Sequence, residues 1–404
     1  MTPADADPKM DAGVRRRIAA LVLVFVASAP AATAATPGSP NALQRKLARA
    51  LRVPHIPPAH SAALALDLGT GAVLYAQNAT RSFAPASNEK LPLTYAALSL
   101  LGPGYRFETD VLGQGSQEGA LWNGALVLKG GGDPTLTHWG LQALAKQVRA
   151  AGIGRVTGGV IADESWFDAQ RTVAGWKPGF YLNESPPISA LVVDRDHVGR
   201  YLSPNPALAA GLAFRTALRQ AGVGVAGPVR LGVADDYVVP LASLQSPSLA
   251  AIVRFMDRES DNFTAEMLLK ELGASQLDRG TSAAGVPTAG VRIVDGSGLS
   301  LLDRLTAIAL DALLRIAWND SMIHQSFVSA LPVAGVNGTL HDRMRRGPAH
   351  GTVIAKTGTT EEASALSGFV RNRYVFAVLQ NGHPLPYWWA RVAQDRFAQV
   401  LAAQ

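Results

Sequence analysis

Three short segments, far apart in the chain, constrain the fold more than any other feature of this sequence. They are residues 87–90 (Ser-Asn-Glu-Lys), 260–262 (Ser-Asp-Asn) and 356–358 (Lys-Thr-Gly). Each is common alone, but the three in this order form the known motif set of active-site serine enzymes that pass through an acyl intermediate. A fold that uses them has to bring one serine and two lysines together from three distant parts of the chain.

The first segment carries a candidate nucleophile and its base. If Ser87 begins a helix, Lys90 lies one turn further along the same face. A serine hydroxyl attacks well only when a base removes its proton, and a lysine can do so if burial and a nearby cation such as Lys356 lower its pKa. Taken alone, the segment fits a helix-capping serine and a surface lysine better.

The second and third segments supply polar groups for the same chemistry. Ser260 can relay a proton between Lys90 and a leaving amine, and Asn262 can bind both Lys90 and a substrate amide. The alternative is a helix N-cap, since Ser, Asp and Asn are the preferred residues there. Either use places the segment between two helices.

The Lys-Thr-Gly segment follows an apolar run and is therefore predicted at the end of a buried strand. Lys356 is costly there unless it meets an anion, and with Thr357 it can bind a substrate carboxylate. Gly358 lets a ligand lie along the strand, and the N–H groups of Thr359 and Ser87 can form an oxyanion hole. The alternative is an edge strand that a lysine protects from aggregation.

The start of the chain predicts export. Three arginines at 15–17, an apolar run at 18–29 and Ala-Thr-Ala at 32–34 are typical of a signal peptide that is cleaved near Ala34. The alternative, a membrane anchor, needs a longer apolar run. The chain has no cysteine, which excludes disulfides and thiolate sites, and its net charge of +6 fits either an anionic cell envelope or an arginine-rich composition.

The apolar patterns predict an α+β fold in two parts. A hairpin at 63–75 and a strand, hairpin and final helix after 353 are expected to share one antiparallel sheet. Between them, short β-like runs at 125–128, 159–162 and 191–193, with helices at 139–151 and 207–221, predict a smaller, mostly β inserted domain. The predicted organisation is a signal peptide at 1–34, a catalytic domain at 41–110 and 241–404, and an insert at 111–240.

With these segments in place, the chain resembles the D-alanyl-D-alanine carboxypeptidase/endopeptidases, the low-molecular-mass class C penicillin-binding proteins with an inserted domain. The resemblance covers most of residues 42–400 and rests on further matching strings, at 83–87 (Phe-Ala-Pro-Ala-Ser), 101–107, 130–136 (Gly-Gly-Gly-Asp-Pro-Thr-Leu), 175–176, 295–300 (Asp-Gly-Ser-Gly-Leu-Ser) and 331–340.

The resemblance implies a penicillin-binding/β-lactamase-like transpeptidase domain, an antiparallel five-stranded sheet flanked by helices and split by the insert. It implies a serine DD-peptidase that cleaves peptidoglycan stem peptides in the periplasm or at the outer face of the envelope and is inhibited covalently by β-lactams. The alternatives are a binding protein of this fold with little catalysis and a β-lactamase-like hydrolase. The 173 residues between Ser87 and Ser260 disfavour the last, because β-lactamases have a shorter gap.

The same resemblance assigns site residues. Ser87, Lys90, Ser260, Asn262 and Lys356 are expected to be catalytic, and the residues expected to bind substrate are Thr357, Gly358, Thr359, Asp163 and Phe167. The last two match residues proposed to recognise the amino end of the stem peptide's diamino acid, with a turn aspartate and a core phenylalanine as the alternative.

Four positions depart from the expected pattern. Pro92 falls in the second turn of the nucleophile helix, where it implies a late helix start or a kink. Leu301 stands where relatives often have arginine, Thr360 stands where they often have leucine, and Glu361 takes a place expected to be neutral.

No cofactor, metal or nucleic-acid partner is expected. The histidines lack zinc-site spacing, the glycines at 130–132 lack the Lys-Ser/Thr of a phosphate loop, and no basic-aromatic stripe is present. Trp388 and Trp389 on the last helix are expected to pack against the sheet, with a peripheral membrane contact as the alternative.

Overall fold

The computed structural model describes residues 41–199, 201–273 and 284–404. The predicted signal peptide lies outside the described residues. The helices and strands of the part that carries the three motifs are α2 (Ala42–Leu51), β1 (Ser61–Asp67), β2 (Val73–Gln77), the 3₁₀ turn η2 (Ala86–Glu89), α3 (Lys90–Leu101), α7 (Leu249–Glu259), α8 (Asn262–Leu272), α10 (Ala307–Asn319), α11 (His324–Ala330), β12 (Val353–Thr359), β13 (Ala363–Val370), β14 (Tyr374–Asn381) and α12 (Tyr387–Ala402).

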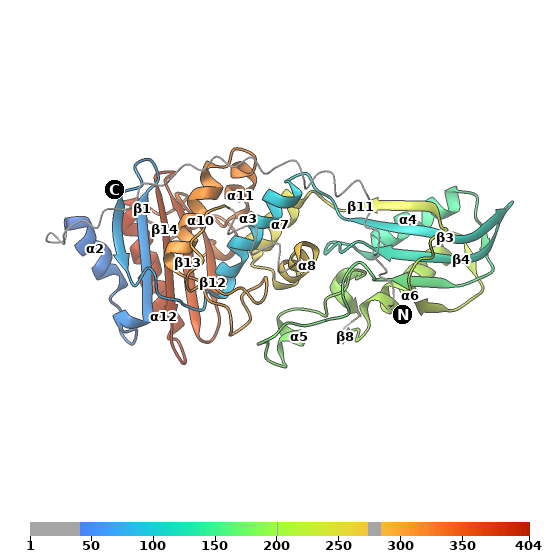
Figure 1. The fold of residues 1–404 in the computed structure, drawn as a ribbon, viewed down its shortest axis with the longest axis horizontal. Coiled ribbons are helices and arrows are strands. Elements are labelled where there is room, and N and C mark those ends of the chain that lie inside the picture. Colours follow the sequence, from blue (N-terminus) through green and yellow to red (C-terminus); the bar gives the residue numbers. More distant parts are fainter. Residues whose placement is uncertain (1–40, 200, 274–283) are drawn as a thin grey trace, which may run out of the picture. The chain divides into compact units, whose positions relative to one another are not determined.

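A five-stranded antiparallel sheet organises this part, in the order β12-β13-β14-β1-β2 (Figure 1). The first strand of the sheet in sequence, β1, pairs along its length with the last, β14, with Ser61 opposite Gln380 and Asp67 opposite Tyr374. The expected sharing of one sheet by the two ends of the chain is confirmed, and the fold is α+β.

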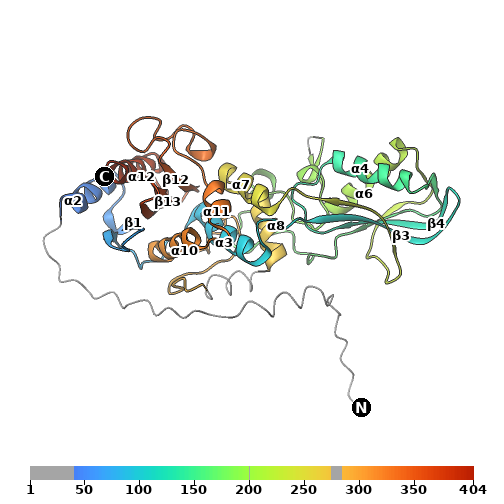
Figure 2. The ribbon, with the colours of Figure 1, turned by 90° about the horizontal axis from the view of Figure 1, so that it is seen from above.

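Helices cover both faces of this sheet (Figure 2). Alternate residues of β1 point to opposite faces of the sheet. On one face, Leu64 and Leu66 belong to a core formed with α3, α7, α8, α10 and α11. On the other face, Ala63 and Ala65 belong to a core formed with α2 and α12. Because both faces are buried, β13 and β14 are almost continuously apolar. The sheet therefore forms a rigid base for its edge strand β12, which carries Lys356.

The segment between α3 and α7 forms a second sheet, with its own core. Its strands and helices are β3 (Glu108–Glu118), β4 (Leu121–Gly130), α4 (His138–Ala150), β5 (Arg155–Val156), β6 (Val160–Asp163), α5 (Phe180–Asn183), β7 (His197–Val198), β8 (Tyr201–Leu202), α6 (Pro206–Gln220), β9 (Gly224–Val225), β10 (Val229–Leu231) and β11 (Val239–Gln245). The order β10-β6-β4-β3-β11 makes its main path, and β5 and β9 extend it beside β4. Apolar residues of α4 and α6, such as Leu144 and Phe214, pack on it.

The sequence placed most of these elements within a few residues, but the strand expected at 191–193 is wrong. Leu191, Val192 and Val193 run through a loop, and they are buried because they fill two separate apolar clusters. A short apolar run does not distinguish a buried strand from a buried loop. The domain boundaries stay a prediction; the second sheet begins at Glu108 and ends at Gln245.

Candidate active site

The nucleophile segment is an abrupt turn that opens into a buried helix. Ala86 has a positive φ of 47°, and η2 carries Ser87 directly before α3 begins at Lys90. The expectation that Ser87 begins the α-helix is therefore off by one turn. Pro92 lies in the first turn of α3, where a backbone N–H has no partner within the helix, so the late helix start holds and no kink is needed.

Lys90 is fully buried, with 0% of its surface exposed, yet its ammonium has three polar neighbours. Nζ lies 3.2 Å from Ser87 Oγ, 2.8 Å from Asn262 Oδ1 and 2.8 Å from the carbonyl oxygen of Ser297. These contacts fix Nζ beside the hydroxyl from which it would take a proton. The structure thus brings Ser87, Lys90 and Asn262 together as the sequence predicted.

Ser260 occupies a strained position between two helices. It ends α7 with left-handed backbone angles (φ 58°, ψ 39°), while Asp261 caps α8 by accepting a hydrogen bond from the Thr264 N–H. The cap expected as the alternative is therefore Asp261, and Ser260 remains available to the site. A non-glycine residue in this conformation costs about 1–3 kcal/mol and tends to occur at functional sites.

Lys356 approaches the same point from the sheet. Its Nζ donates to Ser260 Oγ at 2.8 Å and to the Thr357 carbonyl at 3.0 Å, and the side chain is fully buried. β12 is an edge strand, as the alternative interpretation required. Because Lys356 is buried, however, it cannot protect that edge from aggregation. Asn88 Nδ2 donates to the Lys356 carbonyl at 3.0 Å and ties the nucleophile segment to β12.

The glycine of the third motif is required by close packing. A Cβ on Gly358 would lie 2.8 Å from the Pro85 carbonyl oxygen and 3.0 Å from the Ser87 amide nitrogen. Such contacts are shorter than real Cβ atoms show, so only glycine lets β12 pass this close to the nucleophile. The backbone of β12 therefore lies beside Ser87, as an oxyanion hole would need.

Burial lowers the pKa of both lysines. The pKa of Lys90 falls from 10.5 to about 8, because burial outweighs the opposing influence of Asp295, Glu266, Asp257 and Asp261. The pKa of Lys356 falls to about 7, through burial and the charge of Lys90, against the opposing charge of Asp257. A lysine with a pKa near neutrality can act as a base at physiological pH.

The motif residues open onto a cavity of about 250 Å³. Its walls are formed by Ser87, Glu184, Ser260, Asn262, Gly298, Leu299, Thr339, Arg343, Thr357, Gly358, Thr359, Thr360 and Arg391. Sequence reasoning did not single out Thr339, Arg343, Arg391 or Glu184. Thr339 lies inside a family-like string and Glu184 precedes a proline-rich patch, but neither carries a motif of its own.

Two departures from the expected pattern lie at the border of this cavity. Glu361 is exposed and pairs with Lys177 of the insert at 2.5 Å, so its charge is compensated. Leu301 lines a neighbouring cavity together with Arg304 and Arg81. The two cavities share Gly298, Leu299 and Thr360.

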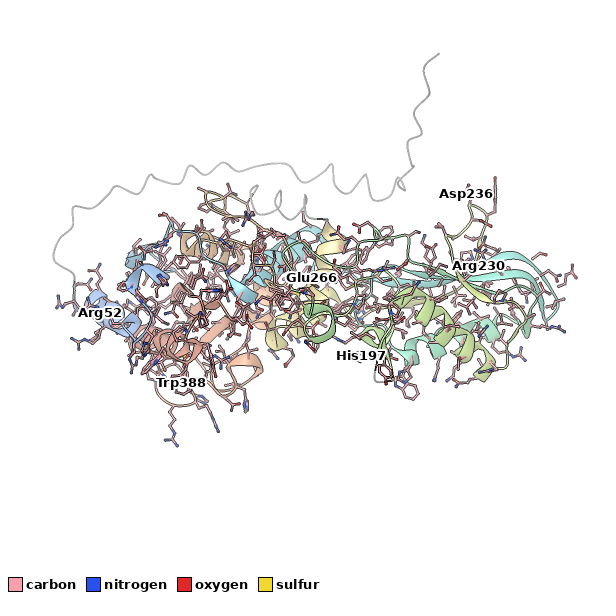
Figure 3. The ribbon with its side chains drawn as sticks, turned by 90° about the horizontal axis from the view of Figure 1, so that it is seen from below. Arg52, His197, Arg230, Asp236, Glu266 and Trp388 are labelled. Atoms are coloured by element: carbon pink, nitrogen blue, oxygen red, sulfur yellow. The ribbon has the colours of Figure 1, made fainter. Side chains whose placement is uncertain are left out.

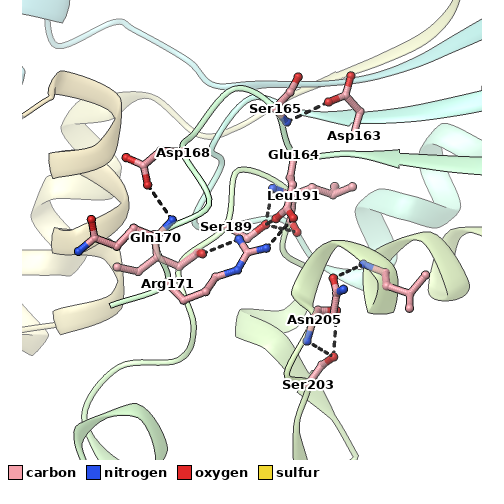
Figure 4. A network of polar contacts seen from close by, with 12 residues as sticks. Asp163, Glu164, Ser165, Asp168, Gln170, Arg171, Ser189, Leu191, Ser203 and Asn205 are labelled. Carbon is pink, nitrogen blue, oxygen red and sulfur yellow. Dashed lines mark hydrogen bonds and ion pairs between the residues drawn. The ribbon is translucent and has the colours of Figure 1, made fainter. Parts of the chain in front are cut away.

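Asp163 and Phe167 do not line the cavity that contains Ser87. Asp163 is buried at the end of β6 and accepts a hydrogen bond from the Ser165 N–H at 2.9 Å (Figure 4). It accepts a second one from the Ala234 N–H, also at 2.9 Å. Phe167 packs against a cluster that includes Phe263 and Met267. These contacts favour the structural alternative, and a role in substrate binding stays a prediction.

The described residues contain no metal-binding cluster and no helix that could span a membrane. Among residues 41–199, 201–273 and 284–404, no group of three His, Asp or Glu side chains is placed to hold a metal ion. In those same stretches no helix combines the length and apolar character that crossing a bilayer requires. The expected packing of Trp388 against the sheet is wrong, since 64% of the residue is exposed (Figure 3). Trp389 instead packs beside Ile56 and Leu385.

Comparison with known proteins agrees with this geometry. The D-alanyl-D-alanine carboxypeptidase of Actinomadura sp. (strain R39) is 32% identical, over 96% of this chain and 91% of the relative. The carboxypeptidase DacB of Mycolicibacterium smegmatis is 33% identical, over 83% and 78%. The crystal structure of penicillin binding protein 4 from Haemophilus influenzae superposes with a TM-score of 0.78 and 21% identity, over 89% of this chain and 98% of that one.

The family model described as the D-Ala-D-Ala carboxypeptidase 3 (S13) family matches residues 43–207 and 200–403. Together these two segments span nearly all of the described chain, including the insert. The resemblance seen in the sequence is confirmed: the chain belongs to the D-Ala-D-Ala carboxypeptidase 3 (S13) family.

Proposed function

We propose that the chain is an exported serine DD-peptidase that cleaves peptidoglycan stem peptides after a D-alanine through an acyl-enzyme on Ser87. The observation that carries the proposal is the fully buried Lys90, whose Nζ lies 3.2 Å from Ser87 Oγ and whose pKa burial lowers to about 8. A capping serine with a surface lysine would show neither the burial nor the contact.

The geometry supports a two-stage reaction. Neutral Lys90 takes the proton of Ser87 as Oγ attacks the carbonyl carbon of the penultimate D-alanine, and the negative charge on the carbonyl oxygen faces the backbone N–H groups of Ser87 and Thr359. The C–N bond then breaks, and the departing amine takes a proton from Lys90 by way of Ser260. Water finally adds to the acyl carbon and releases Ser87.

We expect Thr357, which lines the cavity, and the neighbouring Lys356 to bind the carboxylate at the end of the stem peptide. Protonated Lys356 is already linked to Ser260, so the carboxylate and the proton relay meet at one point. A β-lactam carries a carboxylate and a strained amide in similar relation, so we expect it to acylate Ser87. A crystal structure of the Haemophilus influenzae protein was determined in complex with a β-lactam.

Labelling with a fluorescent penicillin tests the proposal. The mature protein is incubated with the reagent beside Ser87→Ala and Ser99→Ala; Ser99 lies on α3 at an exposed position and serves as the matched control. We expect a stable covalent label on the wild type and on S99A, and none on S87A. A wild type without label contradicts the proposal, and a label lost within seconds favours a β-lactamase-like hydrolase.

The balance between carboxypeptidase and endopeptidase activity needs a natural substrate. Digestion of purified muropeptides followed by mass spectrometry distinguishes loss of a terminal D-alanine from opening of a cross-link. Either product supports the proposal, and the absence of both, in a protein that labels with penicillin, favours a binding protein with little catalysis.

We further propose that the protein acts in the periplasm or at the outer face of the envelope, because peptidoglycan lies outside the cytoplasmic membrane. The arginine-rich start, apolar run and Ala-Thr-Ala site support this location. Sequencing the amino terminus of the protein from envelope fractions tests it: we expect a start just after Ala34, and an intact amino terminus contradicts cleavage.

A further inference from the structure

The buried base Lys90 also contacts a loop that lies outside the three motifs. The loop spans residues 295–300 and presents the Ser297 carbonyl oxygen to Lys90 Nζ at 2.8 Å. A carbonyl can aim at an ammonium only if the peptide planes around it are fixed. The contacts that fix these planes therefore also fix Lys90.

The Glu266 carboxylate binds the N–H groups of the two peptide units that precede that carbonyl in the chain. Glu266 Oε1 accepts hydrogen bonds from the Ser297 N–H at 2.8 Å and from the Gly296 N–H at 3.2 Å, and Oε2 lies 3.3 Å from the same Gly296 nitrogen. Glu266 is on α8, four residues after Asn262, which binds Lys90 from another direction. One turn of one helix thus supplies two of the supports of Lys90.

The setting of Glu266 leaves little freedom for other arrangements. Only 1% of the residue is exposed, and Figure 3 marks its position among the crowded side chains. Neighbouring Asp295 binds the N–H groups of Gly298 at 2.6 Å and Ser300 at 2.7 Å. Together, Glu266 and Asp295 accept hydrogen bonds from the amides of Gly296, Ser297, Gly298 and Ser300. These amides would otherwise be buried without partners.

The insert closes the back of this loop. Trp176 donates its indole N–H to Asp295 Oδ2 at 2.8 Å, and Ser300 Oγ donates to the Ala174 carbonyl at 2.8 Å. The loop is therefore clamped between α8 and a segment of the insert. Glu266 acts on the site from the α8 side of this clamp.

We infer that Glu266 is a positioning residue for the base: by binding the Gly296 and Ser297 amides, its carboxylate aims the Ser297 carbonyl at Lys90 and holds Nζ against Ser87. This inference rests on the role of Lys90 as base under the proposed function. Burial and the nearby charge of Asp295 raise the pKa of Glu266 to about 8, so the negative charge that it gains with rising pH favours the charged form of Lys90. Glu266 makes no contact with the cavity that holds the substrate.

The charged groups around this pair come from several elements. The groups that act on Lys90 or Glu266 are Glu89 on η2, Asp257 on α7, Asp261 before α8 and Asp295 of the loop. Lys356 faces Lys90 from β12, and Asp303 acts on Glu89 and Asp295. All of them are unchanged when Glu266 alone is replaced. A change in the titration of acylation in such a variant therefore reports on the removed charge and the loop it holds.

The test measures the rate constant of acylation by fluorescent penicillin from pH 5.5 to pH 9.5, for wild type and for Glu266→Gln. We expect E266Q to acylate about 10- to 100-fold more slowly, as a misplaced catalytic group does. We also expect the pH at which acylation reaches half its maximum on the acid side to fall, because E266Q lacks the negative charge that Glu266 gains with rising pH and that raises the pKa of Lys90. Glu266→Asp keeps the charge and should retain the wild-type midpoint at a reduced rate.

Glu271→Gln is the matched control. Glu271 lies on the same helix and also accepts two side-chain hydrogen bonds, from the Tyr105 hydroxyl and the Trp166 indole, away from the loop. E271Q should keep the wild-type rate constant and midpoint even if its thermal midpoint drops. A folded E266Q with the rate constant and midpoint of wild type overturns the inference; if E266Q does not fold, a folded E266D with the wild-type rate constant overturns it. Labelling of the wild type, and its loss in S87A, decide the proposed function separately.

Discussion

The pH dependence of acylation should reveal two buried lysines that have to be in opposite protonation states. Lys90 is a base only when neutral, and Lys356 binds a carboxylate only when protonated. Their pKa values are about 8 and about 7. Acylation should therefore rise with pH as Lys90 loses its proton and fall as Lys356 loses its own, which gives a bell-shaped curve with a maximum near pH 7.5.

The pKa values set the size of the effect. At pH 7.5 about a quarter of the molecules have neutral Lys90 and about a quarter have protonated Lys356, so roughly one in 17 has both if the groups titrate independently. With the ordinary lysine pKa of 10.5, only about one molecule in 1,000 would have neutral Lys90 at this pH. Burial of Lys90 thus raises the population of the active base about 200-fold.

The assay is the second-order rate constant of labelling by fluorescent penicillin between pH 5.5 and pH 10, with Lys356→Arg as the second protein. A guanidinium stays protonated throughout this range, so K356R should lose the fall on the alkaline side and rise to a plateau with a midpoint near the Lys90 pKa of about 8. A wild-type rate that still climbs at pH 9.5, or a K356R curve with the same alkaline fall as wild type, would refute this assignment of the two lysines.

Three substitutions test other parts of the structure. Trp176→Phe removes the hydrogen bond to Asp295 and should lower the free energy of unfolding by about 1.5–3 kcal/mol in urea titration; an unchanged value contradicts the clamp between insert and loop. Gly358→Ala places a methyl group 2.8 Å from the Pro85 carbonyl oxygen and should slow penicillin labelling by about 100-fold; normal labelling would mean that the nucleophile segment can retreat. Asp163→Asn can keep only one of the two bonds from backbone amides, because the side-chain nitrogen of asparagine cannot accept, and should cost about 1–3 kcal/mol in thermal unfolding with labelling intact. If muropeptide cleavage alone falls in that variant, Asp163 has the substrate role predicted from the sequence.

The sequence predicted the parts of the site whose chemistry is local. Ser87, Lys90, Ser260, Asn262 and Lys356 stand in short motifs, so their convergence could be expected before any fold was known. The sheet shared by both chain ends also followed from apolar runs near each end. These features depend on side-chain type and spacing, which a sequence states directly.

What the sequence could not predict depends on backbone direction and on distant packing. The Ser297 carbonyl that binds Lys90 is a main-chain group, which no residue type announces. Glu266 gave a weak signal, as an acid within the inward-facing run of α8, but its partners lie 30 and 31 residues away. Residues 191–193 are apolar because they fill two apolar clusters from a loop. Trp388 is exposed, although the adjacent Trp389 packs against apolar residues.

The pairing of β1 with β14 has a consequence for how the protein reaches its working state. Ser61 and Gln380 face each other although 319 residues separate them, so a central strand made at the beginning of synthesis waits for one made near the end. Until β14 arrives, β1 has only β2 as a neighbour, and both its apolar faces lack part of their cover. Contacts of such long range make folding slow. A chain still emerging from a ribosome or a translocation channel therefore has no complete sheet to carry Lys356, and covalent capture of penicillin becomes a measure of finished folding.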